Sequence, residues 1–313
     1  TPADGEPLIS LAQNECFLPP SPAALAAGRS ALAEAALYPD PDWTALRTAI
    51  GHVHGLDPAN ILCGAGSMEL IGALVGAFCG PGRTVLSTEY AYAFFRTAAH
   101  MADAPYTSVP EDGFRVSCAQ ILSAVTPETR LVCIANPGNP TGTVLPAEDL
   151  IALRDALPET VLLLIDEAYA EFVPDAEALF PLSARGNTVV TRTLSKAYAL
   201  AGQRVGWGVF PAEIARDVRK LLNPNNVSGV AQAMAEAVAS MDMMGGDDAP
   251  KPGEGPSKEE RENGFYDVLF AAEMPDGETL HYGVKGKYDP GYGSTSRMLT
   301  ETGIALRSSD KEG

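Results

Sequence analysis

Long hydrophobic runs are missing from this chain of 313 residues, although 46% of the residues are hydrophobic. No stretch approaches the roughly 18 apolar residues that a membrane-spanning helix needs. Residues 1–6 also lack the basic and apolar segments of a signal peptide. We therefore expect a soluble, cytoplasmic protein with no membrane partner and a core large enough for one or two domains.

Basic residues are scarce as well. The chain has 22 Lys and Arg against 40 Asp and Glu, so its formal net charge is −18. Nucleic acids and anionic membranes attract basic surfaces, and this balance argues against both as partners. A few local arginines can still outweigh a global field, so an anionic small molecule remains a suitable substrate.

Cysteines and histidines are few and scattered. The five cysteines and four histidines form no CxxC pair and no metal-ligand spacing. The sequence therefore predicts neither a disulfide framework nor a metal site. Most of the cysteines stand beside apolar residues and are expected to be buried, reduced thiols.

Short apolar runs alternate with helical windows from about residue 60. Nearly continuous apolar strands that alternate with helices predict an α/β fold, with a mainly parallel sheet covered by helices on both faces. Ligands of such sheets bind at the carboxyl ends of the strands. The expected strands are 60–63, 84–87, 129–134, 161–165 and 188–191, and the expected helices include 68–78, 94–101 and 147–157.

The composition divides the chain into three parts. Residues 1–35 are predicted to form an N-terminal arm and helix, and residues 36–240 the main α/β domain. From about residue 241 a stretch rich in glycine, proline and acidic residues is typical of a linker. We predict that 241–313 form an atypical α+β segment in the place of a usual small domain.

Four polar motifs follow the predicted strands in a fixed order. Together they offer an amide, a carboxylate, a phenol, an amine and a guanidinium. Pyridoxal phosphate needs such a set, because a lysine can hold its aldehyde as a Schiff base while an acid keeps its ring nitrogen protonated. The motifs are Asn136-Pro137-Gly138-Asn139-Pro140-Thr141-Gly142, Ile165-Asp166-Glu167-Ala168-Tyr169, Thr193-Leu194-Ser195-Lys196 and Ala201-Gly202-Gln203-Arg204-Val205-Gly206-Trp207.

On these motifs, residues 8–240 resemble the large domain of fold-type I pyridoxal-phosphate aminotransferases, most closely the histidinol-phosphate aminotransferase group. The resemblance implies that Lys196 is the catalytic Schiff-base lysine. It implies that Asp166 pairs with the pyridine nitrogen and keeps it protonated. Tyr169 and Asn139 are then expected to reach the 3′-oxygen of the ring.

The same resemblance assigns the phosphate of the cofactor. Thr193, Ser195 and Arg204 would supply hydroxyl and guanidinium donors. The segment Gly66-Ser67-Met68 opens a predicted helix after a strand, so its amides can bind an anion at the helix N-terminus. Met68 stands where the family usually has a polar or acidic residue, so only a backbone contact is expected there.

Three further residues are assigned by the resemblance alone. Tyr92 aligns with the aromatic residue that stacks on the pyridine ring, and Asn14 with the N-terminal segment on the substrate side. Tyr38, in Leu37-Tyr38-Pro39-Asp40, resembles the tyrosine that reaches the phosphate of the neighbouring subunit. The active unit is therefore expected to be a homodimer.

The tail has a different resemblance. Residues 241–313 are similar to the C-terminal part of saccharopine-dehydrogenase-like oxidoreductases, in segments such as 251–257 and 289–295. A fusion, a frame or assembly artefact, or a shuffled sequence would each account for such a tail. Its predicted elements are a strand pair near 265–270 and 279–284 and a short helix near 295–306.

Transamination is the function predicted first, in amino-acid and specifically histidine biosynthesis. An amino acid or amino alcohol phosphate would give its amino group to pyridoxal phosphate, and a 2-oxo acid would take it back. Arg307, in a Gly-Ile-x-x-Arg element, is the candidate for the substrate carboxylate. The alternatives are a decarboxylase or lyase with the same cofactor, a cofactor-binding chain with impaired turnover, and a nicotinamide-dependent oxidoreductase, which only the tail favours.

Overall fold

The computed structural model describes residues 13–16, 18–173 and 177–240, and the backbone of two later strands, 265–273 and 279–287. The chain divides into two compact units. One comprises residues 14–242, here called the large unit, and the other comprises 1–13 with 243–313. Every candidate site residue that the structure describes lies in the large unit.

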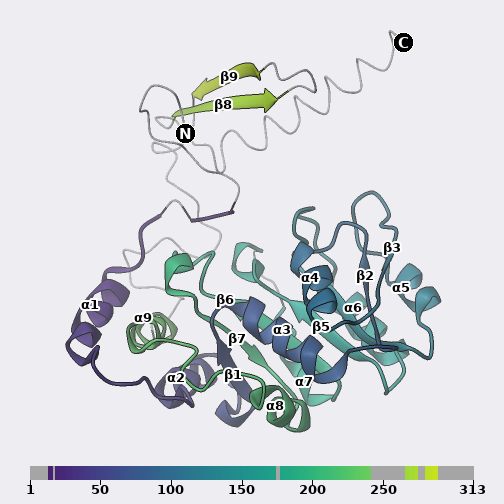
Figure 1. Cartoon of the computed structure of the whole chain (residues 1–313), viewed down its shortest axis with the longest axis horizontal. Coiled ribbons are helices and arrows are strands. Elements are labelled where there is room, and N and C mark those ends of the chain that lie inside the picture. The colour runs from purple at the N-terminus through teal and green to yellow at the C-terminus, as the bar shows by residue number, and fades with distance from the viewer. Residues whose placement is uncertain (1–12, 17, 174–176, 241–264, 274–278, 288–313) are drawn as a thin grey trace. The chain divides into compact units, whose positions relative to one another are not determined.

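A seven-stranded sheet forms the centre of the large unit (Figure 1). Its strand order is β1-β7-β6-β5-β4-β2-β3. Neighbours from β3 to β6 run parallel, whereas β7 is antiparallel to both β6 and β1. The mainly parallel α/β sheet predicted from the sequence is confirmed. The strands are β1 (Ile61–Gly64), β2 (Thr84–Thr88), β3 (Tyr106–Val109), β4 (Thr129–Ala135), β5 (Leu162–Asp166), β6 (Thr188–Thr193) and β7 (Gly206–Val209).

Two strands of this sheet were not predicted. β3 is an edge strand whose middle residues are exposed, so it lacks an apolar run. β7 is completely buried but reads Gly-Trp-Gly-Val, and glycine is unfavourable in strands. Both strands form because neighbouring strands supply their hydrogen-bond partners, which no local pattern records.

Helices cover the sheet and close one end of the large unit. α3 packs on β1, β6 and β7, while α1 and α2 both contact α9 (Figure 1). The α-helices are α1 (Pro22–Ala31), α2 (Thr44–His54), α3 (Ser67–Phe78), α4 (Ala93–Met101), α5 (Cys118–Ala124), α6 (Ala147–Ala156), α7 (Pro181–Ala184), α8 (Ala212–Arg219) and α9 (Gly229–Ala239). Short 3₁₀ turns are η1 (Leu32–Glu34), η2 (Pro58–Asn60), η3 (Ala170–Phe172) and η4 (Ala201–Gln203).

The burial of the central strands explains their continuous apolar runs in the sequence. Strand β5, Leu-Leu-Leu-Ile-Asp, is buried at every position, because helices cover both faces of a parallel sheet. Three cysteines, Cys63, Cys79 and Cys133, are buried free thiols as predicted, whereas Cys16 and Cys118 are half-buried. No helix among the described residues is long and apolar enough to cross a membrane.

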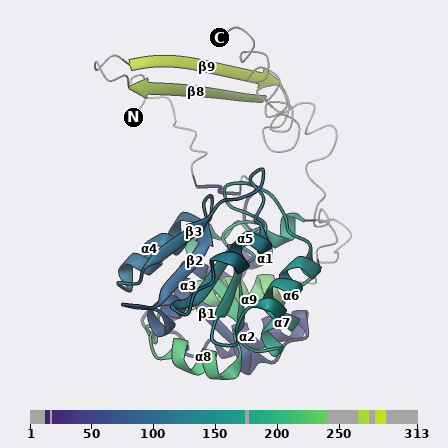
Figure 2. The ribbon, with the colours of Figure 1, turned by 90° about the vertical axis from the view of Figure 1, so that its right-hand side faces the viewer.

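In the other unit, β8 (Phe265–Glu273) pairs antiparallel with β9 (Thr279–Lys287) (Figure 2). The strand pair predicted for this part of the chain is confirmed. The short helix predicted near 295–306 and the tail segments 251–257 and 289–295 lie outside the described residues. The three-part domain division stays a prediction.

Candidate functional site

The carboxyl ends of three neighbouring strands bring the site together. In the sheet register, Ala135 of β4 stands beside Asp166 of β5, and Asp166 stands beside Thr191 of β6. The polar motifs that follow these strands therefore start from one edge of the sheet. The sequence pattern anticipated this arrangement, since parallel strands end at a common edge.

Asp166 is the most perturbed acid of this edge. Its side chain is 3% exposed, and its Oδ1 accepts a hydrogen bond of 2.8 Å from Thr191 Oγ1. Burial raises the pKa of Asp166 to about 7, against the lowering effects of Thr191 and Lys196. The carboxyl group is thus poised to ionise when a cationic partner arrives.

Lys196 lies next to two other predicted residues. Its Nζ donates to the backbone oxygen of Asn14 at 3.3 Å and lies 5.7 Å from the centre of the Tyr169 ring. The side-chain amide of Asn14 donates to the Tyr169 hydroxyl at 2.9 Å. Asn14 adopts a left-handed backbone with φ 51°, a conformation that asparagine tolerates better than most residues. These contacts join the amine, the phenol and the N-terminal segment.

Tyr92 stands at the start of α4, half-buried. Burial raises the pKa of its phenol, the charges of Asp166 and Tyr169 raise it further, and Arg204 lowers it. Electrostatic influence of this kind requires proximity, so Tyr92 belongs to the same cluster. Its ring also makes an edge contact with Phe95, with centroids 5.6 Å apart.

A second group of residues forms an anion cup, defined here as Gly66, Ser67, Ser195 and Arg204, in which Ser67, Ser195 and Arg204 supply the donors. Gly66 caps α3 with φ 81°, and the first amides of a helix have no partner within it. Ser67 and Ser195 are both 7% exposed. Arg204 Nη1 lies 3.3 Å from Ser195 Oγ. Buried amides, a hydroxyl and a guanidinium together suit a phosphate group.

Close backbone approach shapes the cup. A Cβ on Gly66 would overlap the Arg204 guanidinium, and a Cβ on Gly206 would overlap the backbone of Gly66 and Ser67. β1 and β7 are directly paired, with Gly64 opposite Gly206. The absence of side chains at these glycines therefore makes room for the donors.

Three further predicted residues, Thr193, Asn139 and Met68, lie at the end of β6, in a loop and in α3, respectively. Thr193 is buried and donates to Ser195 Oγ at 2.9 Å, so it supports the cup through that serine. Asn139 is half-buried in a loop closed by a bond from Gly142 N to Gly138 O. Met68 has 38% exposure, in keeping with a backbone role only.

Tyr38 does not join the cluster in this chain. Tyr38 has 88% exposure and faces solvent. Arg307 lies outside the described residues, so its expected role at the substrate carboxylate stays a prediction.

Sequence reasoning missed several supporting residues. Thr191 was overlooked, although its position two residues before Thr193 on a buried strand places both on one face. Behind Asp166, Arg192 forms ion pairs with Glu167 at 2.9 Å and with Glu171 at 3.7 Å. No local pattern reveals that two acids and one arginine share a buried position. Groups of metal-binding side chains are absent from the described part of the chain.

Comparison with known proteins gives a consistent result. The family described as aminotransferase class I and II matches residues 6–249. The chain is 46% identical, over 231 residues, to a histidinol-phosphate aminotransferase of Ruegeria pomeroyi, covering 74% of this chain and 64% of the relative. It is 43% identical over 227 residues to that of Hyphomonas neptunium, covering 71% and 62%.

A similar solved structure is histidinol-phosphate aminotransferase from Sinorhizobium meliloti in complex with pyridoxal-5′-phosphate. The TM-score is 0.70 at 35% identity, and the match covers 73% of this chain and 63% of that one. The chain thus spans less than two thirds of the length of these relatives.

Proposed function

Because this chain belongs to the class I and II aminotransferase family, we propose that it is a pyridoxal-phosphate-dependent aminotransferase of the histidinol-phosphate type. One observation carries the proposal. At one edge of the sheet, the amine of Lys196 acts electrostatically on a buried carboxyl group, Asp166, whose pKa is raised to about 7, and an anion cup follows the neighbouring strand. A lysine amine alone or an anion-binding cup alone occurs in proteins of many functions, so only their combination with Asp166 supports this one.

The residues fit the cofactor. The pKa of the buried Asp166 carboxyl group stays raised despite the lowering effects of Thr191 and Lys196, and the protonated ring nitrogen of pyridoxal phosphate would be a further cationic partner for it. The cup offers neutral and cationic donors on segments that lie too close for a Cβ at Gly66. The half-buried Tyr92 lies near Asp166 and is suited to cover a ring.

Each residue then has a defined task. When bound, pyridoxal phosphate supplies an aldehyde that combines with amines and a ring that withdraws electrons from the adjacent carbon. Lys196 Nζ would hold the aldehyde and, once displaced by a substrate amine, carry a proton to and from carbon. Asp166 would accept the ring N–H. Tyr169 and Asn139 would donate to the ring oxygen, and the cup would hold the phosphate.

The substrates are inferred from the relatives. We assign an amino alcohol phosphate or amino acid as donor and a 2-oxo acid as acceptor, because relatives 40–46% identical are histidinol-phosphate aminotransferases. Asn14 lies beside Lys196 Nζ, which suits a residue on the substrate side. A reaction of histidine biosynthesis in the cytoplasm is part of the same proposal.

A homodimer completes the proposal. Tyr38 has 88% exposure and Leu37 71%, so both side chains are accessible to a second copy of the chain. A second copy of the chain would present its own Tyr38 to the cup of the first.

Spectroscopy tests the proposed function. Purified chain supplied with pyridoxal phosphate should show an absorbance band near roughly 410–430 nm that borohydride removes. Lys196→Ala should lack the band. Glutamate or histidinol phosphate should bleach it when a 2-oxo acid is absent. Arg185→Ala, at an exposed ion pair, is a control that should keep the band.

The outcomes separate the alternatives. A parent chain without the band refutes the cofactor assignment. Release of CO₂ from an added amino acid indicates decarboxylation instead of transfer. A band that no amine changes indicates binding without turnover.

A further inference from the structure

A polar network behind the anion cup has no role in the chemistry above. Glu69, in the first turn of α3, folds back so that its Oε2 accepts the backbone N–H of Ala65 at 2.6 Å. The N–H of Gly66 is engaged with Gly64 O at 2.7 Å. The amides that face an anion are therefore those of Ser67 and the residue after it, because the preceding two are occupied.

A carboxylate beside an anion cup needs to be held in place. Glu69 Oε2 also accepts from the side-chain amide of Asn226 at 2.6 Å. The same amide lies 3.3 Å from Cys63 O, at the end of the strand before the cup. Asn226 thus fixes the carboxylate on the amide of Ala65 and away from the position where a phosphate would carry like charge.

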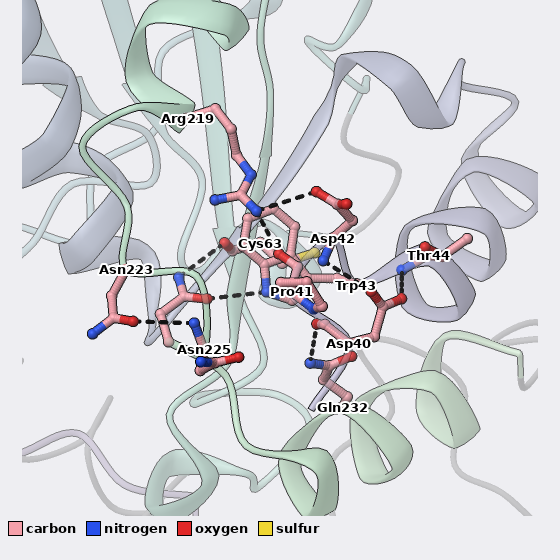
Figure 3. Close-up of polar contacts among 11 residues, drawn as sticks. Asp40, Pro41, Asp42, Trp43, Thr44, Cys63, Arg219, Asn223, Asn225 and Gln232 are labelled. Carbon is pink, nitrogen blue, oxygen red and sulfur yellow. Dashed lines mark hydrogen bonds and ion pairs between the residues drawn. The ribbon is translucent and has the colours of Figure 1, made fainter. Parts of the chain in front are cut away.

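Asn226 has a third partner, which comes from far away in the sequence. Its Oδ1 accepts the indole N–H of Trp43 at 3.0 Å. Trp43 is 1% exposed and has a left-handed backbone with φ 49°, an uncommon conformation for a bulky residue. Arg219 lies over its ring, 4.6 Å from the centroid (Figure 3).

The Trp43 segment is itself anchored at several points (Figure 3). Arg219 donates to Asp42 at 3.1 Å and to Pro41 O at 2.6 Å. Asp40 accepts the amides of Asp42 and Thr44, and these bonds lower its pKa. Residues 40–44 therefore form a fixed segment that begins two residues after Tyr38.

We propose that Asn226 is a positioning residue for the cofactor phosphate, and that it couples the anion cup to the segment 38–44. A phosphate in the cup stabilises the Glu69–Asn226–Trp43 arrangement and so the segment that presents Tyr38. By reciprocity, loosening that segment weakens phosphate binding. The inference rests on the proposed function, because it assigns the phosphate of that cofactor to the cup.

The first test compares pyridoxal phosphate with pyridoxal, which lacks the phosphate. Asn226→Ala should lower the affinity for pyridoxal phosphate about tenfold, the effect of one lost hydrogen bond to a charged group. Its affinity for pyridoxal should change less than about twofold. Asn223→Ala is the matched control, since Asn223 lies in the same loop and, among the described residues, its side chain bonds only locally, accepting from Asn225 N at 3.1 Å. It should leave both affinities unchanged.

The second test addresses coupling. Trp43→Phe removes the indole N–H but keeps an aromatic ring, and should weaken pyridoxal phosphate binding through the same route. Combined with Asn226→Ala it should add little further loss. Equal losses for pyridoxal and pyridoxal phosphate, or fully additive losses in the double variant, would overturn the proposal.

A third measurement uses inorganic phosphate and needs no cofactor. The chain has two tryptophans, so Trp207→Phe leaves Trp43 as the only one. Inorganic phosphate should shift the emission of Trp43 in this background, and Asn226→Ala should abolish the shift. Phosphate that protects the chain from unfolding without changing Trp43 emission contradicts the coupling. A chain that binds no pyridoxal phosphate but shows the phosphate-dependent shift refutes the proposed function and leaves the coupling intact.

Discussion

The buried carboxyl group of Asp166 should make the stability of the cofactor-free chain depend on pH in a specific sense. Its pKa is 3.8 in an unfolded chain and about 7 in the fold. A raised pKa contributes stability that is fully present below about pH 3.8 and is lost as pH rises to about 7. Each pKa unit corresponds to about 1.4 kcal/mol, so ionising Asp166 in the fold costs up to about 4 kcal/mol.

Asp166→Asn removes this titration and keeps an oxygen that can accept from Thr191, the partner of Asp166 at 2.8 Å. The variant should therefore gain stability relative to the parent as pH rises. Linkage gives an increase of about 2.5 kcal/mol in this difference between about pH 5 and pH 8. The same variant should bind pyridoxal phosphate more weakly and transfer amino groups more slowly, because an amide cannot keep the ring nitrogen protonated.

Urea unfolding followed by tryptophan fluorescence measures the difference. Trp43 and Trp207 are both buried and lie in the large unit with Asp166, so their emission reports that unit. Other titrating groups, such as His54, whose pKa burial lowers to about 4, affect parent and variant alike and cancel. Asp155→Asn is the control, since it makes the same chemical change at a side chain that is 62% exposed.

Two results would refute the reasoning. A difference that stays constant from about pH 5 to pH 8 means that Asp166 does not titrate there. A difference of opposite slope means that the ionised carboxylate is stabilised within the cofactor-free fold. Added pyridoxal phosphate should stabilise the parent more than Asp166→Asn, and equal stabilisation would contradict the pairing of this carboxylate with the ring nitrogen.

Two further predictions concern backbone and buried charge. Gly66→Ala should cost more than Gly82→Ala in unfolding free energy and should alone weaken phosphate binding. Both glycines have positive φ, where a side chain costs about 1–2 kcal/mol of strain. Of the two, only Gly66 would also bring a Cβ against the Arg204 guanidinium. Equal losses of unfolding free energy in the two variants would contradict this crowding. Arg192→Met should lower the unfolding free energy by about 3–5 kcal/mol by leaving buried acids unpaired. Glu171→Gln should lower the unfolding free energy far less, because burial raises the pKa of Glu171 and so already disfavours its charged form. Equal losses for the two variants in urea titrations would contradict this.

Much of the site could be predicted because its chemistry follows the strands. Asp166 ends β5 and Thr193 ends β6, and the amine and the guanidinium follow at short distances along the chain. The apolar runs that precede them are visible in the sequence, and parallel strands must end at a common edge. Arg307 was assigned from a family motif, and it lies outside the described residues.

The supporting contacts could not be predicted, since they join distant parts of the chain. Trp43 and Asn226 are 183 positions apart, and neither residue belongs to a recognisable motif. β7 has no apolar run, yet its pairing with β1 brings Gly206 onto the backbone of Ser67. Contacts of this kind depend on which strands and loops the fold brings together.

The sequence by itself determined which groups this protein offers and at which edge of a parallel sheet they lie, because strand periodicity and chain order are local properties. Tertiary structure alone decided how those groups behave. Burial among covered strands moved the pKa of Asp166 to about 7, and the antiparallel return of β7 assembled the anion cup. Charge and backbone spacing depend on neighbours in space, and folding brings those neighbours from distant positions in the chain.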